Sequence, residues 1–128
     1  MMAYSLVCRR EGDLLTVEIR NARNADNLEI STELRRRILA EAPLGVIIDI
    51  RGNFEYPTPL KMYGRVCDSQ EHVNQPAGIP FALVDSEERS DDHSFQEDLI
   101  TNRGYTAKFF HDIERARAWL LEQIPQAG

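Results

Sequence analysis

The sequence has few cysteines and no long apolar run. Its two cysteines, Cys8 and Cys67, are far apart and form no C-x-x-C pair, which is typical of a reducing compartment. We expect both to be small buried hydrophobic residues. No apolar segment approaches the ~20 residues of a membrane span, and the first residues lack the basic and then apolar pattern of a signal peptide. We therefore expect a cytoplasmic protein.

The sequence also has fewer basic than acidic residues. The chain has 15 lysines and arginines against 21 acidic residues, which gives a formal net charge of −6. Phosphate groups would be repelled on average, so the composition argues against nonspecific binding to nucleic acid or to anionic membranes. The basic run Arg35–Arg37 is followed by Glu41 and is interpreted as the solvated face of a helix.

The motifs of common catalytic and metal sites are missing as well. The sequence contains no G-x-S-x-G elbow, no Gly-rich phosphate loop and no H-E-x-x-H pair. His72, His93 and His111 have no ligand spacing, and the acidic segment from Asp85 to Asp98 lacks the D-x-D-x-D-G pattern of a calcium loop. We expect no metal, no cofactor and no enzymatic activity.

Five segments have the composition of strands. No linker or internal repeat separates them, so we expect a single domain over residues 1–128. The first two strands are joined by a hairpin turn at Glu11–Asp13, and the third is apolar enough to be buried on both faces. The predicted strands are Tyr4–Arg9, Leu14–Arg20, Gly45–Arg51, Ile79–Val84 and Thr106–Phe110.

Four segments have helix signals. The pattern Asp26–Glu29 resembles a capping box before an apolar stripe that ends ahead of Pro43. Thr58-Pro59 starts a second helix, and Ser90 to Asp92 opens a third that ends at Gly104. Asp112 caps the last helix. The two clearest stripes are Ile30, Leu34 and Ile38, and Ile113, Ala116, Leu120 and Ile124.

The element order is therefore β-β-α-β-α-β-α-β-α. Alternation of strand and helix after an opening hairpin predicts an α/β fold with a mixed, mostly parallel sheet flanked by helices. Gly45–Arg51 should be central in this sheet. We expect Asp49 to be buried and hydrogen-bonded there, because an unpaired buried carboxylate would cost several kcal/mol.

Two patches resemble a known family. They are Gly45–Gly52 (GVIIDIRG) and Lys108–Leu120, an aromatic strand followed by Asp and a helix with Ala-x-x-Trp-Leu. With the element order, they make the chain similar to the STAS domain, in its SpoIIAA-like branch, which is also grouped with SEC14-type domains. The resemblance implies a SpoIIAA-like fold over nearly the whole chain and a regulatory, non-enzymatic binding role.

The resemblance also implies a place for a switch. In antagonist members of the family, an Asp-Ser-Ser/Thr-Gly motif starts the helix after this strand, and its serine is phosphorylated. Glu55–Pro59 occupies the matching place, with no serine and with prolines on both sides of Thr58. Thr58 is therefore a possible phosphorylation site, but the simpler interpretation is an ordinary helix cap.

The candidate binding site lies after the third and fourth strands. The carboxyl ends of neighbouring parallel strands meet at one edge of the sheet, where open α/β folds bind ligands. Aromatic side chains in the first loop either anchor a partner or fold back over the sheet end. The candidate residues are Asn53, Phe54, Tyr56, Thr58, Asp85 and Ser86.

We expect this site to recognise a partner protein or a small apolar, lipid-like ligand. The alternative is a small α/β enzyme whose acid–base groups come from Asp49, Asp85 or the Asp91, Asp92 and His93 cluster. That alternative requires at least two of these groups to converge in one cleft. A homodimer is also possible, and no motif in the sequence locates its interface.

Overall fold

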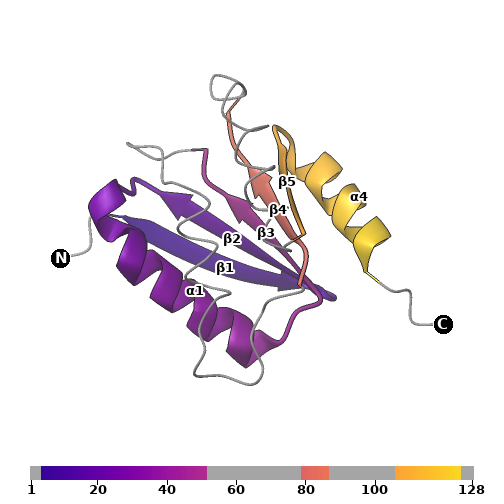
Figure 1. Cartoon of the computed structure of the whole chain (residues 1–128), viewed down its shortest axis with the longest axis horizontal. Helices are drawn as coiled ribbons and strands as arrows, with labels where there is room; N and C mark the ends of the chain where they lie inside the picture. Colours follow the sequence, from indigo (N-terminus) through magenta and orange to yellow (C-terminus); the bar gives the residue numbers. More distant parts are fainter. Residues whose placement is uncertain (1–3, 52–78, 87–105, 125–128) are drawn as a thin grey trace.

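The five strands that the structure describes form one sheet. The computed structural model describes residues 4–51, 79–86 and 106–124 (Figure 1). Within them the strand order is β1-β2-β3-β4-β5, where β1 and β2 are antiparallel and all other neighbours are parallel. The mostly parallel sheet with a central third strand is thus confirmed. The bounds are β1 Ser5–Glu11, β2 Leu14–Arg20, β3 Gly45–Asp49, β4 Phe81–Val84 and β5 Ala107–Phe110.

The strand boundaries differ from the prediction by up to two residues. β1 continues to Glu11, so the hairpin turn consists of Gly12 and Asp13 alone, with Gly12 at a φ of 59°. Such a φ is accessible to glycine without steric cost. β3 stops at Asp49 instead of Arg51, because the Asp49 carboxylate accepts the backbone N–H of Arg51 and turns the chain there.

Helix α1 spans Asn27–Glu41 and follows a short 3-10 turn, η1, at Asn24–Asp26. The predicted apolar stripe is confirmed, since Ile30, Leu34 and Ile38 are all fully buried. The helix ends before Pro43, as expected, with Ala42 in the left-handed conformation.

The capping box predicted at the start of α1 is wrong. A side-chain cap needs a residue with extended backbone, but Asp26 belongs to η1 and already has helical angles. Its carboxylate instead accepts the backbone N–H of Arg23, which lies in the turn before the helix. The acidic residue therefore closes the preceding turn and makes no cap hydrogen bond to α1.

Helix α4 spans Ile113–Gln123 and begins as predicted. Asp112 has extended backbone, and its side chain accepts the backbone N–H groups of Glu114 and Arg115. Ala116, Leu120 and Ile124 of the predicted stripe are buried. Within this stripe the Cδ atoms of Leu120 and Ile124 also approach Gly45 so closely that a Cβ there would lie 3.2 to 3.3 Å from them.

The two described helices cover opposite faces of the sheet (Figure 1). Side chains alternate along each strand, so Val46 and Ile48 of β3 pack with α1, while Ile47 packs with α4. α4 lies against β3, β4 and β5. Asp49 has the same parity as Ile47 and therefore points to the α4 face.

The second and third predicted helices, after Thr58 and after Ser90, lie outside the described residues. None of the helices that the structure describes is long and apolar enough to cross a membrane. The described residues also contain no cluster of three or more His, Cys, Asp or Glu side chains suited to a metal ion.

Candidate functional site

The most strongly organised polar group in the described residues lies at the carboxyl end of β3. Asp49 is 0% exposed, although it lies next to the point where the chain leaves the sheet. Its Oδ1 accepts the backbone N–H of Arg51 at 3.1 Å and the Arg51 Nε at 3.0 Å. Its Oδ2 accepts one guanidinium nitrogen of Arg51 at 2.9 Å and one of Arg20 at 3.0 Å. The predicted burial and hydrogen bonding of Asp49 are confirmed.

This cluster connects two strands. Arg20 is the last residue of β2, and it also donates to the Asp49 backbone carbonyl at 3.4 Å. The Arg51 guanidinium donates one hydrogen bond to each Asp49 carboxylate oxygen, and this bidentate contact fixes the orientation of both side chains. The Asp49–Arg51–Arg20 cluster therefore fixes the path of the chain at the exit of β3.

The electrostatics of the cluster keep Asp49 ionised. Burial raises the pKa of Asp49, but the hydrogen bonds from Arg51 and Arg20 outweigh it, so the pKa lies below its ordinary value. The same hydrogen bond to Asp49 raises the pKa of Arg51. A carboxylate that stays ionised and has both oxygens occupied is poorly suited to proton transfer.

Asp85 follows β4 and is also 0% exposed. Its backbone N–H donates to the Phe110 carbonyl, and its Oδ1 accepts the backbone N–H of Ser86 at 2.8 Å. The His111 Nδ1 lies 3.2 Å from the Asp85 carbonyl oxygen. These contacts connect the ends of β4 and β5. They hold Asp85 and Ser86 in place at the point where the chain leaves β4.

The two buried carboxylates do not converge. Asp49 pairs in register with Val84, so Asp85 is one position further along and, by strand alternation, on the other face. This arrangement removes the Asp49–Asp85 pair as a basis for acid–base catalysis. Asp91, Asp92 and His93 lie outside the described residues.

The four loop residues of the predicted site, Asn53, Phe54, Tyr56 and Thr58, also lie outside the described residues. The two partners of Asp49, Arg20 and Arg51, were not predicted from the sequence. A signal for Arg51 was present, because it is two positions after Asp49 and so has the same strand parity. Arg20 carried a weaker signal, since it becomes a neighbour only in the observed register, which pairs Asp49 with Glu18.

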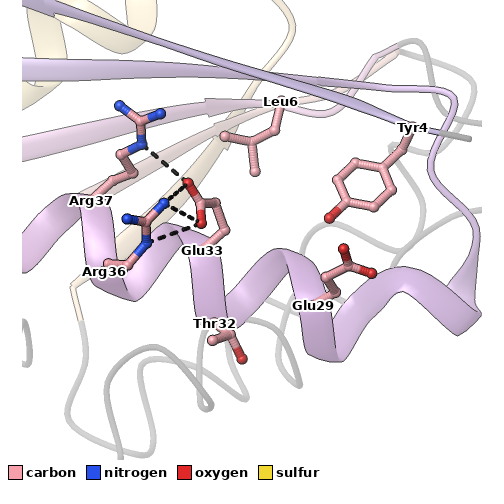
Figure 2. A pocket seen from close by; sticks show the side chains of 7 residues that line it. All are labelled: Tyr4, Leu6, Glu29, Thr32, Glu33, Arg36 and Arg37. Carbon is pink, nitrogen blue, oxygen red and sulfur yellow. Dashed lines mark hydrogen bonds and ion pairs between the residues drawn. The ribbon is translucent and has the colours of Figure 1, made fainter. Parts of the chain in front are cut away.

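A second polar region lies between β1 and α1. A pocket of about 620 Å³ is lined by Tyr4 and Leu6 from the strand side, and by Glu29, Thr32, Glu33, Arg36 and Arg37 from the helix. Figure 2 shows the side chains of Tyr4 and Leu6 directed toward the helix and the Tyr4 hydroxyl directed toward Glu29. Burial and the neighbouring Glu29 carboxylate raise the pKa of Tyr4 to about 12.

Comparison of the sequence with known proteins gives no match, either to a protein-family model or to a curated protein. Solved structures do match. One is an anti-sigma factor antagonist from Mycobacterium paratuberculosis, with a TM-score of 0.64, 10% identity and coverage of 92% of this chain and 94% of that chain. Another is a serine-to-glutamate form of RsbS from Moorella thermoacetica, with a TM-score of 0.56, 15% identity and coverage of 89% and 96%.

These likenesses cover almost the full length of both partners, so they concern the whole arrangement of strands and helices and not one motif. They agree with the observed topology, in which a hairpin is followed by parallel strands and α4 packs on the face of the sheet opposite α1. At 10% to 15% identity, they concern the fold alone. The protein has the SpoIIAA-like fold of STAS domains.

Proposed function

We propose that this protein is a non-enzymatic regulatory module that binds a partner protein at the carboxyl end of its sheet. The observation that carries the proposal is the Asp49–Arg51–Arg20 cluster, which fixes the exit of β3 at the edge where such folds bind. The likeness to an anti-sigma factor antagonist supports a protein of the anti-sigma class as the partner.

The proposed contact surface starts from this fixed exit. It combines Asn53, Phe54, Tyr56 and Thr58 of the loop with Asp85 and Ser86 after β4. Aromatic anchors bury a large area at a low cost in side-chain entropy, so Phe54 and Tyr56 are the proposed source of affinity. The Asp85 carboxylate accepts the Ser86 backbone N–H and so holds Ser86 in place next to this surface.

We do not expect phosphorylation to control this contact. Pro57 and Pro59 flank Thr58 where the family switch has acidic and glycine neighbours, so the local match to a kinase site is lost. A phosphate at a helix start would still add up to about two negative charges, which makes a test worthwhile.

The test is native affinity purification of the tagged chain from its own cells. A stoichiometric protein partner should be retained by the wild type and by Thr58→Ser, and it should be lost from Phe54→Ala/Tyr56→Ala. The matched control is Leu44→Ala, which removes a half-exposed side chain (46%) just before β3, at the opposite end of the sheet.

Native mass spectrometry of the same samples separates the other outcomes. A retained small apolar molecule without a protein partner would move the proposal to a lipid-like ligand at the same surface. Stoichiometric phosphate on Thr58, with partner binding abolished in Thr58→Glu, would show that the phosphorylation switch operates after all.

A further inference from the structure

β1 is an edge strand whose outer side has no partner strand within the described residues. All seven of its residues pair in regular register with β2, so no bulge interrupts the edge. Natural edges are usually blunted by charge, proline, bulges or a covering element. The half from Ser5 to Cys8 has no proline or charged residue, and Val7 in its centre is 50% exposed.

The helix beside this edge has an ordered charge pattern. Tyr4 faces Glu29 near the start of both elements, and an Arg10 guanidinium nitrogen bonds to the Glu41 carbonyl near the end of both. β1 and α1 therefore run side by side in the same direction (Figure 2). Along the pocket side of α1, two acidic residues, Glu29 and Glu33, precede two basic residues, Arg36 and Arg37.

We propose that a second copy of this chain pairs with the free edge of β1, in antiparallel orientation, to form a two-fold symmetric dimer. A two-fold axis at Val7 would place Val7 opposite the same residue of the second copy and Leu6 opposite Cys8. Ser5 would then face Arg9, so no like charges are directly opposed along the strand.

The helices supply the charge complementarity. A two-fold axis at Val7 reverses the direction of the second α1, so Glu33 of each helix would lie beside Arg36 and Arg37 of the other. The complementarity is confined to this middle stretch, because the last turn of each α1 carries Glu41 on the β1 side. Glu33 already bonds to Arg36 and Arg37 in its own chain, yet Arg36 and Arg37 remain 70% and 51% exposed and can reach further acceptors. Such a contact is isologous, because each surface meets its own copy.

The free edge and the charge order together favour a second copy of this chain as the occupant. A free strand edge alone would accept many extended segments. The order of two acidic and then two basic residues on the pocket side of α1 is complementary to a second α1 only when that helix runs in the opposite direction. The dimer would also close the mouth of the pocket, with Cys8 of the second copy placed over Leu6. This interface is separate from the surface proposed above for the regulatory partner.

Light scattering over a dilution series of the full chain tests the edge. The wild type should reach twice the mass of one chain. Val7→Lys should raise the dimer dissociation constant at least about tenfold, because two like charges would face each other across the axis. Leu44→Lys alters an equally exposed apolar residue away from β1 and should leave the constant unchanged. A wild type that stays monomeric, or a dimer that Val7→Lys leaves intact, overturns the proposal.

A charge exchange tests the helices. Glu29→Arg/Glu33→Arg and Arg36→Glu/Arg37→Glu should each be monomeric, and their equimolar mixture should form a heterodimer, because the four exchanged positions then carry opposite charges in the two chains. Circular dichroism would check that both variants keep their helices. A mixture that stays monomeric while both variants are folded rules out the reversed helix arrangement.

A crosslink tests the axis without relying on affinity. Val7→Cys in a Cys8→Ser/Cys67→Ser background should give a covalent dimer on mild oxidation, since the two new thiols would meet across the axis. Leu44→Cys in the same background should not. Failure of Val7→Cys to crosslink excludes the proposed register.

Discussion

Asp49 and Glu33 are each held by two arginines, but they lie in opposite environments. The Asp49 carboxylate is 0% exposed and bonds both to Arg51 and to Arg20 of β2, which lies 29 positions before it in the sequence. The Glu33 side chain is 30% exposed and bonds to Arg36 and Arg37, three and four positions away on one helix. The chemistry of the two clusters is the same, and only burial and connectivity differ.

The difference shows what makes an ion pair matter. The exposed cluster competes with water and salt, and it adds contacts between residues that the helix already places side by side. The buried cluster has removed a carboxylate from water, so its arginines must replace that solvation, and in doing so they connect two strands. We therefore expect the Asp49 cluster to control stability and the Glu33 cluster to be available for contacts with other molecules.

The largest expected contrast is between Asp49→Ala and Glu33→Ala. Removing one partner of a buried ion pair costs about 3–5 kcal/mol, and we expect about 3 kcal/mol for Asp49→Ala because Arg20 and Arg51 remain partly exposed. Glu33→Ala should change the free energy of unfolding by about 0.5 kcal/mol or less. Urea unfolding of the two variants measures both values. Equal losses would contradict the comparison.

The second contrast is the response to acid. The pKa of Asp49 is lowered in the folded protein, so its contribution to stability is complete above the unfolded pKa of about 4 and is lost as the pH falls through the folded value. The free energy of unfolding should therefore fall below about pH 4 in the wild type. Asp49→Asn should flatten this fall, whereas Glu33→Gln should follow the wild type closely. Urea unfolding at stepped pH would reveal the difference.

The third contrast appears at alkaline pH, on the pocket side. The pKa of Tyr4 is raised to about 12, mainly by burial and by Glu29. The unfolded tyrosine ionises near pH ~10, so stability that is present below this pH is lost as the pH rises toward 12. The phenolate absorbance of the wild type, minus that of Tyr4→Phe, should titrate near pH 12. A difference spectrum that titrates near pH ~10 would show an exposed phenol.

The smallest expected effect is the coupling between Glu33 and Arg37. A double-mutant cycle of Glu33→Gln and Arg37→Gln should give about 0.3–0.5 kcal/mol, as is usual for such a helical pair. In about 1 M salt the coupling should disappear, because the screening length is then ~3 Å. Coupling that persists in high salt would mean that the pocket side of α1 is shielded from solvent and would weaken the comparison.

Much of the fold could be predicted because the signals were local. The stripe Ile30, Leu34 and Ile38 has helical spacing, the run from Gly45 to Asp49 is apolar on both faces, and Asp112 stands before a helix start. Each of these patterns acts through neighbours in sequence or through simple burial. The capping box at Asp26 was wrong because Asp26 is itself part of the 3-10 turn η1 and has helical backbone angles, which the residue pattern did not show.

The candidate site could be predicted only in part. The sequence indicated that Asp49 is buried and paired, because an unpaired carboxylate inside a central strand is too costly. The identity of the pair depended on register, which aligns β2 with β3 so that Arg20 reaches past Glu18 to Asp49. The loop residues Asn53, Phe54, Tyr56 and Thr58 remain predictions, to be tested by the partner experiment above.

The sequence by itself determined the order of the described elements, the two apolar helix stripes and the central position of β3, because side-chain periodicity and turn residues act over short distances. The tertiary structure alone decided which residues meet across elements. Arg20 and Asp49 are 29 residues apart, and Tyr4 and Glu29 come from different elements. Their contacts exist because the sheet aligns strand ends and α1 lies along β1. Such long-range alignment is set by packing of the whole core, and no local pattern encodes it.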